Sequence, residues 1–230
     1  MSRQPGQTFE IYLESGARRT FAAALGWPGW CRMGRDEAAA LAGLLAAGPR
    51  YARVLRSTKL GFRAPADIAA LVITERLAGS ATTDFGAPDR IPASDIQPLA
   101  ELELGRLQAI LEACWRAMDA AVDQAQGQAL RPGPRGGGRS LAGIVEHVLG
   151  AEASYLAQLG GRAPANSPPS PAPLREAILK TLAAAAQGEI APYGPRGGKR
   201  WPPRYFVRRA AWHILDHVWE IEDRLEDRAA

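Results

Sequence analysis

Three histidines are the side chains of this 230-residue chain best suited to bind a metal ion: His147, His213 and His217. His213 and His217 are four residues apart, so on a helix both imidazoles leave the same face. Two ligands from one helix and one from a neighbouring helix can hold a divalent cation with coordination positions left open. The alternative is that the pair lies on the surface or is merely structural.

Other residues near the pair refine this chemistry. Ile214 stands where an HExxH motif has its glutamate, which disfavours a zinc protease of that type. Glu220 follows His217 by three residues and shares its face, so we take Glu220 as the candidate catalytic residue. It could orient a ligand imidazole or act as a general base. The alternative for Glu220 is an ion pair with Arg224, four residues later.

The histidines fall in the second part of the chain, which the apolar periodicity predicts to be helical. Ser140 is a suitable cap for the helix that carries His147. The prolines Pro202 and Pro203 are tolerated only at the start of the helix that carries His213 and His217. We predict helices over about 99–126, 139–159, 174–187 and 203–225, with a proline-rich linker at 163–171 between the second and third. Four such segments favour a four-helix bundle in up-down-up-down order over residues 99–230.

The first part of the chain indicates a mixture of strands and a helix. Residues 9–13 alternate apolar and polar types, which is the period of a strand. We predict strands at 9–13, 19–22 and 70–74, a loop at 27–31, a helix at 36–56 with a break at Pro49, and turns over 79–98. The predicted fold class is therefore α+β: a small N-terminal α/β domain, residues 1–98, followed by the helical bundle.

Composition excludes several classes of protein. Hydrophobic residues make up 47% and charged residues 23%, so the chain is not disordered as a whole. The net charge of +4 is spread along the sequence, which makes a nucleic-acid partner an unfavoured prediction. The longest charge-free apolar stretch, 38–49, is shorter than the roughly 20 residues that span a bilayer. Glu10 and Glu14 interrupt any secretory signal, so no membrane partner and a cytoplasmic location are expected.

The two cysteines, Cys31 and Cys114, are far apart and form no CxxC motif. This spacing argues against a disulfide scaffold and against a cysteine-ligated zinc site. We expect both to be structural. A thiol that takes part in chemistry at the histidines would then come from outside the chain.

The stretches Ser140–Glu152 and Arg208–Asp223 resemble those of the DinB-like superfamily of four-helix bundles. The resemblance covers about residues 99–227. It implies that a divalent ion, zinc or nickel, is held by His147, His213 and His217. It also implies an enzyme that uses a low-molecular-weight thiol such as mycothiol, bacillithiol or glutathione. Residues 1–98 resemble HicB-like antitoxin domains over about 50 residues, through Trp27–Cys31 and the segment Asp36–Ala38.

In an up-down-up-down bundle the second and fourth helices are parallel, so the loops before them share one end. Helix N-termini there would add positive potential. Arg135 and Arg204 are our candidates for binding an anionic thiol or substrate, and the alternative is a solvated basic loop. The basic residues of the two loops are Arg131, Arg135, Arg139, Arg196, Lys199, Arg200 and Arg204.

Two main hypotheses about function follow. The first is a metal-dependent enzyme that transfers or isomerises through an external thiol, or hydrolyses through metal-activated water. The second is a non-catalytic, metal-stabilised binding or regulatory module, whose N-terminal domain recruits a partner and whose bundle forms a homodimer. A third, a HicB-like antitoxin that contacts nucleic acid, is disfavoured by the balanced charge.

Overall fold

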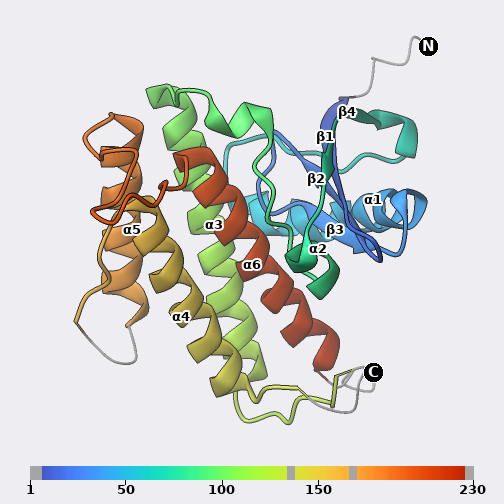
Figure 1. Cartoon of the computed structure of the whole chain (residues 1–230). Helices are drawn as coiled ribbons and strands as arrows, with labels where there is room; N and C mark the ends of the chain where they lie inside the picture. The colour runs from blue at the N-terminus through green and yellow to red at the C-terminus, as the bar shows by residue number, and fades with distance from the viewer. Residues whose placement is uncertain (1–6, 134–137, 166–169, 226–230) are drawn as a thin grey trace.

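The computed structural model describes residues 7–133, 138–165 and 170–225. It has an α+β fold, in which a four-stranded mixed sheet precedes several helices (Figure 1). The elements are β1 (Phe9–Ser15), β2 (Thr20–Ala24), β3 (Cys31–Gly34), α1 (Glu37–Val54), β4 (Leu71–Ala78), α2 (Ala81–Phe85), α3 (Glu101–Ala125), α4 (Leu141–Leu159), α5 (Pro171–Ala186) and α6 (Pro203–Arg224), with short 3-10 turns at Leu55–Ser57, Ile68–Ala70 and Ala93–Ile96.

The sheet has the strand order β3-β2-β1-β4, with β1 antiparallel to β2 and parallel to β4. The expected strands at 9–13, 19–22 and 70–74 are present, each longer or shifted by a few residues. Two expectations are wrong. Cys31, predicted to be in a loop, starts β3, and α1 continues through Pro49 without a break.

Both faces of the sheet are covered, which explains why every residue of β2 is buried. On one face, Phe9, Ile11 and Leu13 of β1 pack in the same core as side chains of α1. On the other face, Tyr12 and its neighbours pack against Trp212 of α6. The segment that contains α2 also lies on this second face, because Glu14 of β1 accepts hydrogen bonds from the Thr83 hydroxyl and from two backbone amides after α2.

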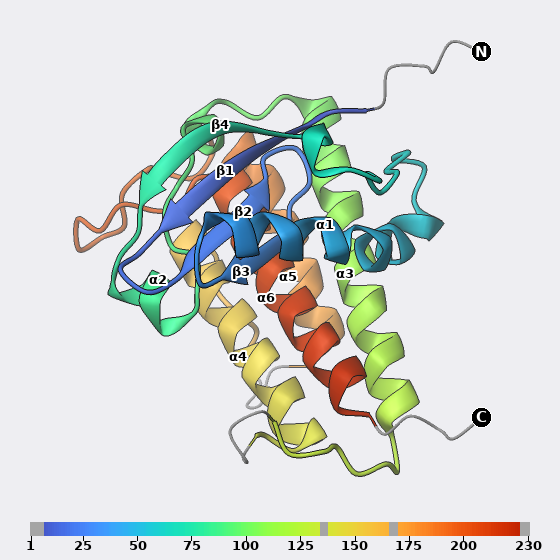
Figure 2. The same ribbon diagram turned by 90° about the vertical axis from the view of Figure 1, so that its right-hand side faces the viewer.

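The long helices α3, α4, α5 and α6 pack side by side (Figures 1 and 2). The start of α6 lies beside the end of α4, where the Trp201 amide donates to the Gln158 carbonyl at 2.9 Å. The end of α6 lies beside the segment that leads into α4, where the Arg131 amide donates to the Arg224 carbonyl at 2.8 Å. Helices α4 and α6 are therefore antiparallel.

The expected up-down-up-down order is wrong for this reason. Arg175, near the start of α5, pairs with Asp119, near the end of α3, so α5 is antiparallel to α3. Arg204, at the start of α6, pairs with Glu103, at the start of α3, so α3 and α6 are parallel. Because α4 and α5 are each antiparallel to these two helices, α5 runs in the same direction as α4, as Figure 1 shows. The order along the chain is down, up, up, down.

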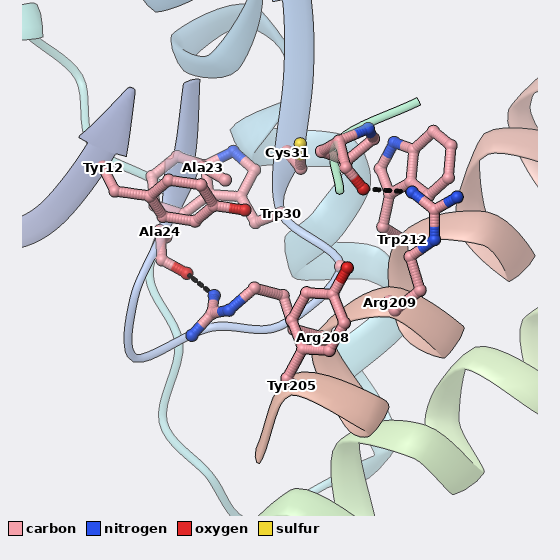
Figure 3. A pocket seen from close by; sticks show the side chains of 11 residues that line it. Tyr12, Ala23, Ala24, Trp30, Cys31, Tyr205, Arg208, Arg209 and Trp212 are labelled. Carbon is pink, nitrogen blue, oxygen red and sulfur yellow. Dashed lines mark hydrogen bonds between the residues drawn. The ribbon is translucent and has the colours of Figure 1, made fainter. Parts of the chain in front are cut away.

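One hydrophobic core extends through both parts of the chain, since side chains of β1, α1 and all four long helices belong to it. A buried ion pair joins the two parts as well. Arg208 of α6 donates a hydrogen bond through Nε to the Asp95 carboxylate at 2.6 Å. It also donates through Nη1 to the Ala24 carbonyl at 2.9 Å, a bond that Figure 3 shows. Burial opposes the charge of Arg208, but Asp95 raises its pKa overall, so the guanidinium stays charged.

The bundle also contains a buried acid, Glu152 of α4, which is 1% exposed. The indole Nε1 of Trp115 donates a hydrogen bond to its carboxyl. Burial raises the pKa of Glu152 to about 7, although the Trp115 hydrogen bond and the charge of Arg175 act in the opposite direction. In the folded protein the Glu152 carboxyl thus keeps its proton up to about pH 7, whereas the ordinary pKa of a glutamate is 4.5.

We expect Glu152→Gln to stabilise the protein in a pH-dependent way. Because the folded-state pKa is raised, wild-type stability falls as the pH rises from about 4.5 through 7. The variant lacks this loss, so it should be about 2–3 kcal/mol more stable at pH 8 and nearly equal at pH 4.5. Urea unfolding at both pH values measures the difference. The exposed Glu146→Gln on the same helix is the control, and an equal pH slope in wild type and Glu152→Gln would contradict the expectation.

Among the helices that the structure describes, none combines the length and the apolar character needed to cross a lipid bilayer.

Candidate metal centre

Helices α4 and α6 bring the three histidines together. His147 lies in the second turn of α4, whose start is fixed by Ser140, because the Ser140 hydroxyl accepts from the Gly143 amide. His213 and His217 lie one turn apart on the face of α6 that contacts α4. The antiparallel packing of α4 and α6 allows His147 to contact His213 and His217, because all three residues lie where the two helices overlap in length.

The geometry of the cluster suits a single ion. The Nε2 atoms of His147 and His213 are 3.2 Å apart, and one ligand atom from each of the three histidines lies within 4.8 Å of the others. Tetrahedral zinc with bonds of 2.0–2.1 Å requires nitrogen pairs separated by about 3.3 Å. Small side-chain movements would therefore let all three imidazoles share one ion.

The protonation state of the cluster also suits a cation. His213 and His217 are each 8% exposed, and His147 is half-buried. Burial, followed by the neighbouring histidines, lowers the pKa of His213 to about 2. Burial and then the charge of Arg139 lower the pKa of His147. Both rings are thus neutral near pH 7, and neutral imidazole is the form that binds metals.

His213 and His147 face each other through Nε2, where at most one ring can donate a proton. The Nδ1 atom of His213 is buried and has no hydrogen-bond partner among the described residues. A buried imidazole with so few partners costs free energy. A cation at the centre would accept the Nε2 lone pairs that face each other there, while Nδ1 of His213 would still lack a partner in the part of the chain that the structure describes.

Glu220 contacts a histidine of the cluster and fixes its orientation. One carboxylate oxygen of Glu220 accepts from Nδ1 of His217 at 2.8 Å, and the other accepts from Arg224 at 2.7 Å. The two alternatives for Glu220 thus occur together, as an ion pair and as a histidine partner. With its proton on Nδ1, His217 presents the Nε2 lone pair to the centre.

Glu220→Gln should weaken metal binding by about 10- to 100-fold, because partners that orient a ligand imidazole typically contribute that much. The amide can still accept from His217 but lacks the charge that makes the imidazole more basic. Competition with a chromogenic chelator measures the zinc affinity. The exposed Glu222→Gln, two residues later, is the control, and an unchanged affinity in Glu220→Gln would show that Glu220 has no influence on the centre.

The two arginines predicted to bind an anionic cofactor are not shown together. Arg204 lies at the start of α6, where its guanidinium pairs with Glu103 and donates to the Pro98 carbonyl at 2.8 Å. Arg135 lies outside the described residues. The predicted common end of the two loops is wrong, because α4 and α6 are antiparallel and their starts lie at opposite ends of the bundle.

Two further residues beside the cluster, Tyr155 and Arg209, were not among the predicted site residues. The Tyr155 ring lies 5.7 Å from the His213 ring, measured between centroids. The Arg209 guanidinium lies over the rings of Tyr155 and Trp212, and it donates to the Pro88 carbonyl. Tyr155 is eight residues after His147, which is a helical spacing that could have signalled a shared face. The contact with Pro88 has no local signal, because 121 residues separate the two positions.

Both cysteines are buried, as expected. Burial raises the pKa of the Cys31 and Cys114 thiols well above the ordinary value. Neither is therefore a thiolate at neutral pH, and neither belongs to the histidine cluster.

Fold and site together define an α+β protein with a three-histidine cluster between two antiparallel helices. The chain matches no protein-family model, no curated protein and no solved structure.

Proposed function

We propose that this protein is a divalent-metal-dependent enzyme of DinB-like type, with zinc or nickel held by His147, His213 and His217. The observation that carries the proposal is the convergence of three imidazoles, one ligand atom from each, within 4.8 Å. Among the described residues no fourth ligand joins them in this cluster. Structural zinc sites are usually closed by four protein ligands, whereas catalytic sites keep a position open, so three ligands favour catalysis over a purely structural role.

The chain's own residues have distinct parts in this proposal. His147, His213 and His217 bind the ion, and Glu220 holds His217 in the tautomer that leaves Nε2 free. The ion supplies Lewis acidity, which lowers the pKa of a thiol or water that binds to it. Since both cysteines are buried and protonated, the thiol is a small molecule from outside the chain.

The substrate or thiol that fits this centre is a small anion. Arg139 and Arg209 lie close enough for their charges to lower the pKa of His213. Arg139 is exposed, directly before the cap of α4, where the helix dipole adds positive potential. These residues replace Arg135 and Arg204 in the proposal, because Arg204 already pairs with Glu103.

The test is an activity assay on protein stripped with a chelator and reloaded with zinc or nickel. Glutathione, bacillithiol and mycothiol are each offered with a chromogenic electrophile, and an activated ester is offered without thiol. We expect turnover only in the loaded protein, and its loss in His217→Ala. The matched control is Glu222→Gln, an exposed position on the same helix.

The outcomes separate the competing functions. Loss of turnover upon metal removal, with a thiol or with the ester, supports the enzyme and identifies its class. Tight metal binding with no turnover in any arm would favour the non-catalytic module instead. Equal rates in stripped and loaded protein would contradict the proposal.

A further inference from the structure

A second feature lies inside the helical bundle and is separate from the histidine cluster. Residues of α3 and α4, with contributions from α5 and α6, line a cavity of about 230 Å³ that is partly open to solvent. Its walls are mostly apolar, with Met118 and Val122 from α3 and Val145 and Leu149 from α4. A cavity with apolar walls and a few polar groups is the usual form of a small-molecule site.

The polar group at this cavity is Glu152, the buried acid of α4. Among the described residues, its one side-chain hydrogen bond comes from the indole of Trp115, a neutral donor. A buried carboxylate ordinarily needs a cation or several donors to offset the loss of hydration. One indole N–H leaves most of that requirement unmet.

The cationic side chain that lines the cavity, Arg175, is already paired. Both Nη atoms of Arg175 donate to the Asp119 carboxylate at 2.7 Å, which is a bidentate pair. The Nε of Arg175 is buried without a partner among the described residues and offers one further donor, but no free charge. Asp123 adds another carboxylate to the lining. The charges of Arg175 and Asp119 offset each other and Asp123 is exposed, so Glu152 has no cation of its own in the described part of the chain and, once ionised, favours a positively charged occupant.

We propose that this cavity binds a small apolar molecule that carries a protonated amine, with the amine on Glu152 and the apolar part against the walls of α3 and α4. An alkyl ammonium group supplies both the charge and the donors that Glu152 lacks. The same carboxylates would repel an anionic ligand. This site does not depend on the metal centre, so the two proposals can fail separately.

The experiment is isothermal titration calorimetry on metal-free full-length protein with three probes of equal chain length: hexylamine, hexan-1-ol and hexanoate. The titrations are run at pH 8, where Glu152 is largely ionised and hexylamine is protonated, since alkyl amines titrate near pH 10. We expect hexylamine to bind at least about tenfold more tightly than hexan-1-ol, and hexanoate to bind most weakly. In Glu152→Gln the preference for the amine over the alcohol should fall to about threefold or less, with alcohol binding retained.

Two further variants locate the site. Glu146→Gln, on the exposed face of α4, should keep the full preference for the amine. Val145→Phe, which fills part of the cavity, should weaken binding of both amine and alcohol. Equal affinity for the three probes, an unchanged preference in Glu152→Gln, or no detectable binding of hexylamine would each overturn the proposal.

Discussion

His213→Ala should reduce zinc binding by at least a hundredfold. Structural zinc sites with four ligands bind with about 10–16 kcal/mol, or roughly 3 kcal/mol for each ligand. Loss of one ligand of three therefore corresponds to a factor of a hundred or more in affinity. His213 is only 8% exposed, so external water cannot easily replace it.

The measurement is thermal unfolding with and without zinc, together with metal analysis. An ion that binds only the folded state stabilises wild type by about 2.7 kcal/mol at a hundred times its Kd. His213→Ala should show little of this stabilisation at the same zinc concentration. Glu222→Gln, on the exposed side of the same helix, should retain it. A variant that keeps one ion per chain and the full stabilisation would remove His213 from the centre.

Arg208→Met should destabilise the protein by about 3–5 kcal/mol, because it leaves a buried carboxylate without its partner. Asp95 is 1% exposed, and Arg208 is 6% exposed. The variant also leaves the Ala24 and Leu25 carbonyls without the donors they have now. Figure 3 shows how Arg208 reaches from α6 toward the strand residues. Since this contact holds α6 against the sheet, its loss also loosens the helix that carries two of the three histidines.

Urea unfolding measures the effect, and Arg204→Met is the matched control on the same helix. Arg204 has a side chain that is 15% exposed and donates to the Pro98 carbonyl, but its partner Glu103 is 40% exposed and stays solvated, so the control should lose less, about 1–2 kcal/mol. The double variant Arg208→Met with Asp95→Leu should recover part of the loss, because no buried charge is then left unpaired. Equal losses in Arg208→Met and Arg204→Met would contradict the assignment.

The His213–His217 pair could be predicted from sequence because its signal is local, whereas its meeting with His147, 66 residues away, was implied by the DinB-like resemblance. The spacing of His213 and His217 fixes a common helical face, and a cap at Ser140 places His147 early in its own helix. The start of α6 could also be predicted from a local signal, since the helix begins at Pro203 as expected. The partnership of Glu220 with His217 follows from the same helical spacing.

Helix direction was not a local signal, which is why the predicted bundle order failed. The connection between α4 and α5, residues 160–170, has eleven residues. In an extended proline-rich form it could reach about 34 Å, at 3.1 Å per residue. The 16 residues of α5 rise only about 24 Å. The linker is thus long enough to return to the other end of the bundle, so α5 can run parallel to α4.

The contacts that join the two parts of the chain could not be predicted either. Arg208 meets Asp95 across 113 residues, and Asp95 lies in a segment that the sequence shows only as turn-rich. Glu152 gives no sign of burial in its local pattern, because an isolated glutamate on a helix is ordinarily exposed. Such long-range partners depend on the packing of the whole fold rather than on spacing along the chain.

The central claim, that three imidazoles share one ion, is tested most directly by anomalous scattering at the zinc edge from crystals of the zinc-loaded protein. We expect one peak per chain, with His147, His213 and His217 each at about 2.0–2.1 Å from it through a ring nitrogen. A peak elsewhere, or no peak between α4 and α6 in crystals grown with excess zinc, would contradict it.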